Sequence, residues 1–286
     1  MKPELECAPC LHIWLYERAG VCANHEIRFQ LSRSILKTLS EEFRSEVNLA
    51  LLANRTIEPI EEFVLQSSQY YDPFKLKSNQ HARELMPKAK MFIDHGKTEQ
   101  ERLVRACCLA SASNIAPIGG PSGSFKFQEV IDILDGEKSL PLVMGDVFKN
   151  IKKAKRIFYI PDNAGEIGFD GLLISQLKEM GKEVTLIVKE DPFFEDATLK
   201  DASFFNLDHL VDHLFTVKGL FVPNDIPPPL MEAFHQSDLI LSKGTGNYEA
   251  LQDEVNGKPV IYMLKIKCKP IAERVGVDIG TFVVKV

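Results

Sequence analysis

The spacing of apolar residues changes near the middle of this chain. In the first half, apolar residues recur every three or four positions, which is the period of one buried helix face. In the second half, short apolar runs rich in Ile and Val alternate with helical patterns, as in parallel α/β folds. We therefore predict an α/β protein: a three-layer α/β/α, Rossmann-like, mostly parallel sheet, with an N-terminal all-helical subdomain. The predicted division is residues 1–150 and 151–286.

Several helix boundaries follow from local signals in the first half. Asn24 is a predicted N-cap for a helix with one buried stripe, formed by Ile27, Leu31, Ile35 and Leu39. A second helix is predicted from Glu41, and a third around 60–71 that stops before Asp72-Pro73, because a residue before proline is pushed out of the α region. Thr98 and Glu101 form a predicted capping box for a fourth helix.

Residues 113–124 follow that helix and hold three glycines and two prolines, so regular structure is not expected there. Two interpretations stay open for this segment. It is either a plain linker or a loop over an active site, with Asn114 facing inward.

The strands predicted in the second half are separated by helical patterns. They are residues 157–160, 184–188, 239–241, 260–264 and 281–284. A helix that starts at Glu166 is predicted to end at Met180-Gly181, with glycine in its usual position after the last turn.

Charge and composition exclude some functions. A formal net charge of −6 disfavours nucleic acid binding, although a local basic site for phosphate is compatible with it. No apolar run approaches the roughly 20 residues that span a bilayer, and the first residues do not form a signal peptide. We therefore predict a cytoplasmic protein without a membrane or nucleic acid partner. The sequence leaves the oligomeric state open.

The six cysteines are better interpreted as thiols than as disulfides in such a protein. Cys7 and Cys10 form a Cys-x-x-Cys pair, which is compatible with a metal site, a redox dithiol or simple burial. A structural zinc needs four ligands, and the nearest further donors, His12, Cys22 and His25, form no standard second pair. The remaining cysteines, Cys22, Cys107, Cys108 and Cys268, are expected to be small core residues.

Polar side chains follow three predicted strands at the point where each strand ends. Asp162 and Asn163 follow the first, Asp191 or Asp196 follows the second, and Gly244-Thr-Gly246 follows the third. Adjacent parallel strands end at the same edge, where open α/β sheets bind ligands. The alternative for Asp162 and Asn163 is that they only cap the following helix.

These residue types favour metal-assisted phosphate chemistry. Carboxylate and amide oxygens suit hard divalent ions, and glycine loops before helices present amides to phosphate. Lys265 or Lys267, after the next strand, is a candidate to neutralise a phosphate, although a solvated charge run explains both equally well. We expect a metal-activated water to attack phosphorus, with Glu166 or Asp170 orienting it or acting as general base.

Taken together, these motifs resemble the damage-control phosphatases, a family long catalogued as a domain of unknown function. The motifs are Asp162-Asn163-Ala-Gly-Glu166, Glu195-Asp196-Ala-Thr198, Lys243-Gly-Thr245-Gly246-Asn247-Tyr248-Glu249 and Lys267-Cys268, preceded by Cys7-Ala-Pro-Cys10. The chain looks like the short prokaryotic branch with an N-terminal Cys-x-x-Cys, which acts on nucleotides and sugar phosphates. One departure is Ser113-Asn114-Ile-Ala-Pro, where relatives often have an aspartate after Gly-Asn.

The resemblance implies a metal-dependent phosphatase for small phosphorylated metabolites, with Mn²⁺, Ni²⁺, Co²⁺ or Mg²⁺ as cofactor. It implies that Asp162, Asn163 and Asp196 bind the metal. The residues that we predict to be catalytic are Asp162, Glu166 and Lys267. Substrate binding is expected at Asn114, Lys243, Thr245, Gly246, Asn247, Tyr248, Glu249 and Lys267. It leaves the roles of Cys7, Cys10 and Cys268 unassigned.

Two alternatives remain at this stage. Asp162 as a covalent nucleophile of the haloacid-dehalogenase type would need a second acid two residues on, where this chain has Ala164. A non-catalytic module that binds metal or nucleotide, or a protein regulated through the redox state of Cys7 and Cys10, would bind phosphometabolites without hydrolysing them.

Overall fold

In a computed structural model, which describes residues 1–255 and 257–286, the second half of the chain folds around a seven-stranded sheet. The strand order is β1-β7-β6-β5-β2-β3-β4. The strands are β1 Leu142–Met144, β2 Arg156–Ile160, β3 Glu183–Lys189, β4 His213–Val217, β5 Leu239–Lys243, β6 Val260–Lys265 and β7 Phe282–Lys285. All neighbours are parallel except β6 and β7. The predicted mostly parallel sheet is confirmed, and β1 and β4 are strands that the sequence pattern did not predict.

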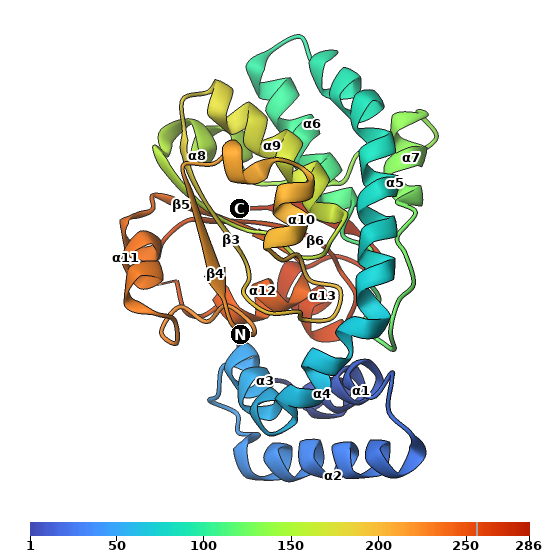
Figure 1. The fold of residues 1–286 in the computed structure, drawn as a ribbon. Helices are drawn as coiled ribbons and strands as arrows, with labels where there is room; N and C mark the ends of the chain where they lie inside the picture. Colours follow the sequence, from blue (N-terminus) through green and yellow to red (C-terminus); the bar gives the residue numbers. More distant parts are fainter. Residues whose placement is uncertain (256) are drawn as a thin grey trace.

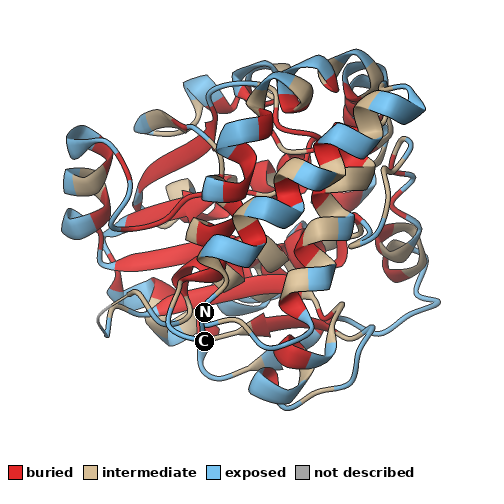
Figure 2. Ribbon diagram, turned by 90° about the horizontal axis from the view of Figure 1, so that it is seen from below, coloured by how far each residue is buried: buried red, intermediate tan, exposed pale blue. Residues whose placement is uncertain are grey.

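The sheet lies between two hydrophobic cores, and β2 shows how the sequence produces this arrangement. Phe158 and Ile160 pack in one core, and Ile157 and Tyr159 pack in the other. Successive side chains of a strand point to opposite faces, so an unbroken apolar run is needed where both faces are covered. The central strand β5 is buried along its length, and β2 is buried after Arg156 (Figure 2).

Helices cover both faces, so the predicted three-layer arrangement is confirmed. The first core packs against α1 Cys7–Ala19, α2 His25–Glu42, α3 Leu49–Ile57, the 3₁₀ helix η1 Glu58–Ile60, α4 Glu61–Gln66, α11 Pro228–Gln236, α12 Thr245–Leu251 and α13 Lys269–Val275. The second packs against α5 Ser68–Asp94, α6 Glu99–Ala112, α7 Gln128–Leu134, α8 Val147–Lys153, α9 Glu166–Glu179, α10 Leu199–Phe204 and the 3₁₀ helix η2 Leu207–His209.

The N-terminal helices fall into two groups (Figure 1). Helices α1–α4 lie together beyond α12 and α13, whereas α5 runs along the side of the molecule and α6 packs on α9 and β6. The division at residue 150 stays a prediction. The elements α6 and β1, which precede that residue, pack on the sheet or belong to it.

Most predicted helix ends are confirmed. The Asn24 side chain accepts a hydrogen bond from the Ile27 amide and caps α2, and α9 ends before Gly181, which has a φ of +72°. The Thr98 side chain accepts from the Glu101 amide, but the Glu101 carboxylate accepts from the Lys97 amide instead of closing the box.

Two helix predictions were wrong. The helix predicted from Glu41 begins at Leu49, because Asn48 accepts hydrogen bonds from the next amides and starts α3 there. The chain also remains helical through Pro73, which lies inside α5. Packing of buried α5 residues such as Tyr71 and Ala82 outweighs the one backbone hydrogen bond that proline removes.

The order of the strands places a crevice between β2 and β5. These two strands are neighbours, and the chain continues from β2 to β3 on one side and from β5 to β6 on the other. In open α/β sheets, ligands bind outside the carboxyl ends of the strands at such a switch point. Asp162 and Gly244 follow β2 and β5 at this end of the sheet.

Candidate metal and phosphate site

A pocket of about 180 Å³ lies at this edge of the sheet. Its walls come from the segments that follow β2, β3, β5 and β6, from α1, and from the glycine-rich segment after α6. The residues around its polar part are Arg18, Asp162, Asn163, Glu195, Asp196, Thr245, Gly246, Asn247, Glu249 and Lys267. The predicted convergence of strand ends on one site is therefore present in the structure.

Asp162 is held in place by an amide and a glycine. Its Oδ2 accepts a hydrogen bond of 2.7 Å from Nδ2 of Asn114, which follows α6. The same carboxylate lies against the main chain of Gly244, where an added Cβ would be 2.1 Å from Oδ2. Gly244 also has a φ of +82°, which favours glycine for a second reason. The glycine loop therefore makes room for the carboxylate.

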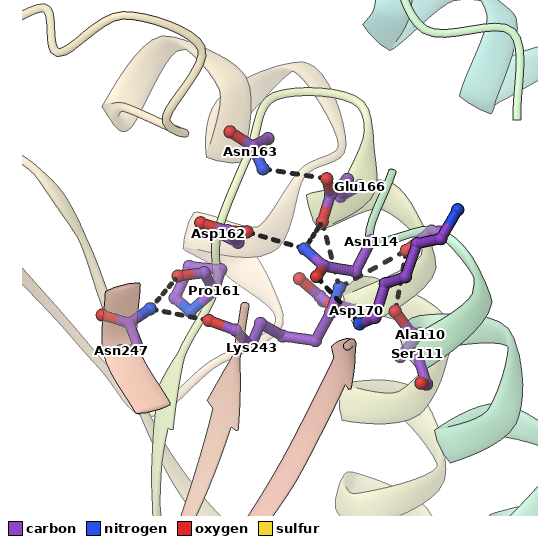
Figure 3. A network of polar contacts seen from close by, with 12 residues as sticks. Ala110, Ser111, Asn114, Pro161, Asp162, Asn163, Glu166, Asp170, Lys243 and Asn247 are labelled. Carbon is purple, nitrogen blue, oxygen red and sulfur yellow. Dashed lines mark hydrogen bonds and ion pairs between the residues drawn. The ribbon is translucent and has the colours of Figure 1, made fainter. Parts of the chain in front are cut away.

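Asn163 and Asp196 face each other across a short antiparallel bridge between the segments after β2 and β3. The Ala197 amide donates to the Asp162 carbonyl and the Ala164 amide to the Glu195 carbonyl, each at 2.9 Å. Nδ2 of Asn163 donates to Oε1 of Glu166 at 2.9 Å, which leaves the amide oxygen available as a ligand (Figure 3). These backbone bonds bring the three predicted metal ligands together.

Asp196 lies near both a carboxylate and an ammonium group. Burial raises the pKa of Asp196 to about 7; Lys189 opposes the rise and Asp162 adds to it. The Lys189 ammonium is 3.4 Å from Oδ2 of Asp196. Two carboxylates and an amide oxygen match hard divalent ions, and such a set leaves positions for water and substrate.

A buried ionic network lies beneath Asp162 (Figure 3). The Lys243 ammonium is 2.9 Å from Asp170 and 3.6 Å from Glu166, and all three side chains are fully buried. Burial raises the pKa of Glu166 to about 7, against the opposing charge of Lys243. Burial lowers the pKa of Lys243, but Asp170 and Glu166 outweigh it, so the pKa is raised overall. Lys243 is thus held charged beneath the pocket.

Three of the predicted site residues lie beneath the pocket instead of in its wall. Asn114, Glu166 and Lys243 are fully buried and do not line the pocket among the described residues. Asn114 donates to Asp162 and to Glu166, and its oxygen accepts from the Lys265 amide, so its amide group is fully used. This placement favours positioning of Asp162 and Asn163 over the direct substrate or catalytic contacts expected from the sequence.

The loop after β5 contributes polar groups to the pocket. Thr245, Gly246, Asn247 and Glu249 line it, whereas Tyr248 packs against Tyr262 with only 1% of its surface exposed. The Thr245 hydroxyl is buried and has no hydrogen-bond partner within residues 1–255 and 257–286. Asn247 donates to the carbonyls of Pro161 and Lys243, which joins the ends of β2 and β5.

Lys267 also lines the pocket. Burial lowers its pKa, whereas Asp162 and Glu166 raise it. In the part of the chain that the structure describes, its ammonium group has no ion-pair partner. A pocket-lining ammonium without a carboxylate partner and an unpaired hydroxyl are groups that a phosphate would satisfy.

Cys7, Cys10 and Cys268 lie together along the pocket wall. Burial raises the pKa of Cys10 to about 11, and Glu249 adds to the rise. Among the described residues, no group of three or more His, Cys, Asp or Glu side chains is arranged to hold a metal ion. Of the four cysteines expected in the core, Cys107 and Cys108 are buried as predicted. Cys22 is exposed and Cys268 lines the pocket, so the prediction was wrong for these two.

The sequence analysis missed Arg18. Its side chain is 2% exposed and forms an ion pair of 3.1 Å with Glu195, the residue before Asp196. Arg18 continues the buried stripe of Cys7, Leu11 and Leu15 on α1. A charged residue in such a stripe is the signal that identifies it.

Three comparisons with known proteins match nearly the whole chain. Residues 5–283 match the damage-control phosphatase ARMT1-like domain. An uncharacterized protein of Methanocaldococcus jannaschii is 31% identical over 98% of this chain and 94% of its own length. A damage-control phosphatase of Archaeoglobus fulgidus is 30% identical over 100% of this chain and 99% of its own. The crystal structure of a DUF89 family protein from Pyrococcus horikoshii superposes with a TM-score of 0.80 at 26% identity, over 99% of this chain and 98% of that one.

No helix among the described residues has both the length and the apolar character needed to cross a membrane.

Proposed function

The chain belongs to the damage-control phosphatases with an ARMT1-like domain, and from this premise we propose that it is a metal-dependent phosphoric monoester hydrolase. Its proposed substrates are small phosphorylated metabolites: sugar phosphates, nucleotides or damaged phosphometabolites. The family is generally metal-dependent, and we propose Mn²⁺, Ni²⁺, Co²⁺ or Mg²⁺ as the cofactor. A cytoplasmic location stays a prediction from the sequence.

One observation carries the proposal. Asp162, Asn163 and Asp196 line the same pocket as Lys267 and Thr245. The buried Thr245 hydroxyl has no hydrogen-bond partner among the described residues. The first set suits a hard divalent cation, and the second set suits phosphate oxygens. The first set would hold the cation, and the second set would bind the phosphate group of a monoester in the same pocket.

We propose a separate role for each residue of the pocket. Asp162, Asn163 and Asp196 would hold the cation, which would supply Lewis-acid chemistry and activate water at neutral pH. Lys267 and Thr245 bind the phosphate oxygens and stabilise the charge that grows on them. Glu166 accepts a hydrogen bond from Asn163 and fixes its amide oxygen toward the pocket. Lys243 balances the buried charge of Glu166 and Asp170.

The first test is hydrolysis of a generic aryl phosphate with each of the four metals against a chelated control. Equal rates would contradict metal dependence. Asp162→Ala and Asp196→Ala should each lower turnover on the order of 1000-fold, because each removes a ligand of the charge-stabilising cation. Asp191→Ala is the matched control: Asp191 is exposed in the same connection after β3 and should leave the rate unchanged.

A second measurement separates binding from chemistry. The divalent metal should raise the melting temperature of the wild type and not that of Asp162→Ala, since a ligand that binds only the folded state stabilises it. Metal stabilisation without turnover over a broad panel of phosphometabolites would favour the non-catalytic alternative. A trapped aspartyl phosphate would instead favour Asp162 as a nucleophile.

A further inference from the structure

Arg18 is a fully buried cation to which the proposed chemistry assigns no role. A guanidinium is costly to bury unless its donors are bonded. Its Nε donates to Oε2 of Glu195 at 3.1 Å, and its Nη2 donates to the Pro117 carbonyl at 2.7 Å. Its Nη1 donates to the carbonyls of Ile118 and Gly119. Three of these four acceptors belong to one short segment of backbone.

The second oxygen of Glu195 binds the same segment further along. Oε1 accepts from the Ser122 amide at 3.2 Å and from the Ser122 hydroxyl at 2.7 Å. One ion pair therefore contacts residues 117–119 and residue 122. We call residues 115–124 the pocket loop, because Ala116, Pro117 and Ile118 line the substrate pocket.

The pocket loop has few other attachments. Within residues 1–255 and 257–286, no backbone-to-backbone hydrogen bond involves residues 115–124. The next hydrogen bond from the backbone is that of Phe125, whose amide donates to the Ser78 hydroxyl at 2.8 Å. A Cβ at Gly119 would meet no atom within 4 Å, so packing does not fix that part. Ala116, at the start of the loop, packs in the second hydrophobic core. The polar attachments of residues 117–122 come mainly from Arg18 and Glu195.

Glu195 is itself fixed to the metal side of the pocket. Its carbonyl accepts from the Ala164 amide at 2.9 Å, and Asp196 follows it in the chain. Arg18 comes from the other side, on α1. The ion pair joins α1, the pocket loop and the metal-binding edge, while Asp162 and Asp196 are held by backbone bonds that do not involve Arg18.

We propose that Arg18 is a positioning residue of this enzyme: with Glu195 it holds the pocket loop as a wall of the substrate pocket and so sets substrate affinity. The kinetic consequence rests on the proposed phosphatase function; the anchoring of the loop does not. Loss of Arg18 weakens binding of the part of the substrate that lies against residues 116–118. It leaves the metal ligands and Lys267 in place, so the chemical step changes little.

The test is Arg18→Lys in the full chain. Lysine keeps the charge but lacks the planar set of donors that reaches several acceptors at once. We expect KM for an aryl phosphate to rise about tenfold, the effect of losing one or two hydrogen bonds, with kcat within about threefold. Under native conditions, a protease of broad specificity should cut within residues 115–124 about tenfold faster, as mapped by mass spectrometry.

Two further variants serve as controls. Arg55 pairs with Glu42 at 2.7 Å on the surface, and Arg55→Lys should change neither KM nor the cleavage rate. Ser122→Ala removes one donor to Glu195 without leaving a buried charge unpaired, so it should fold normally. We expect it to shift both measurements in the same direction as Arg18→Lys, by a smaller factor.

The outcomes distinguish the two proposals. Unchanged cleavage of the pocket loop in Arg18→Lys, or a lower kcat at constant KM, would overturn the role of Arg18. If Arg18→Lys does not fold, unchanged cleavage in Ser122→Ala would overturn it instead. If the wild type hydrolyses no phosphate ester while the loop of Arg18→Lys is cut faster, the anchoring stands and the phosphatase function fails.

Discussion

The Asp162 carboxylate lies so close to the α-carbon of Gly244 that no side chain fits between them; a Cβ there would be 2.1 Å from Oδ2. Gly244→Ala must therefore move Asp162, a proposed metal ligand. We expect metal-dependent hydrolysis to fall on the order of 1000-fold, as for loss of Asp162 itself, and the metal to lose its effect on the melting temperature.

The control for this variant is Gly276→Ala. Gly276 has a φ of +80°, close to the +82° of Gly244, but a Cβ there meets nothing within 4 Å. Both substitutions introduce the same backbone strain, about 1–2 kcal/mol. Only the variant at position 244 should lose activity. Full activity in Gly244→Ala would mean that the Asp162 position seen here is not needed for metal binding.

Lys243 offers a test of the buried network. Lys243→Met leaves the Asp170 and Glu166 carboxylates without their buried counter-charge, so we expect a loss of about 3–5 kcal/mol in the free energy of unfolding. Urea denaturation measures this loss. Adding Asp170→Asn to the variant should restore part of the stability, because one uncompensated charge disappears. A single variant as stable as the wild type would show that the network does not hold Lys243 charged.

The fold was predictable where burial leaves a pattern in the sequence. β2, β3 and β5 are buried on both faces and appear as apolar runs. β1 and β4 lie at the two edges of the sheet. β1 has three residues with exposed or half-exposed side chains, and β4 begins with an exposed histidine. Edge strands cover less of the core, so their sequences carry a weaker signal.

The part of the site that could be predicted from the sequence consists of residues that follow the ends of strands. Asp162, Asn163 and Asp196 follow neighbouring parallel strands, and they line one pocket. Sequence spacing did not separate the roles of the two lysines: Lys243 ends β5 beneath the site, whereas Lys267 lies beyond β6 and faces the pocket. The ion pair of Arg18 with Glu195 spans 177 residues, and no local pattern encodes a contact over that distance.

The cysteines of the pocket should be slow to react. Burial, with Glu249 adding to it, raises the pKa of Cys10 to about 11, so little thiolate is present near pH 7. We expect iodoacetamide to alkylate the exposed Cys22 well before Cys10 at pH 7.5, as followed by peptide mass spectrometry. Labelling of Cys10 should accelerate as the pH approaches 10. Equal rates at pH 7.5 would favour the redox-regulated alternative.

Glu249 gives the protein a specific dependence of stability on pH. Burial raises its pKa from 4.5 to about 7, with the amino group of Met1 opposing the rise. The folded protein therefore binds the proton more tightly than the unfolded chain does. The stabilisation is complete below about pH 4.5 and is lost as the pH rises through about 7. Because Glu249 is partly exposed to the pocket, we expect a loss of about 1–2 kcal/mol.

Glu249→Gln isolates this effect, since glutamine resembles the protonated carboxyl group at every pH. In urea denaturation between pH 5 and pH 8, the wild type should lose stability relative to Glu249→Gln as the pH rises. Glu273→Gln changes an exposed carboxylate on α13. Its free energy of unfolding should depend on pH in the same way as that of the wild type. If the curve for Glu249→Gln is also parallel to that of the wild type, the Glu249 carboxyl group ionises with an ordinary pKa and the pocket around it is open to water.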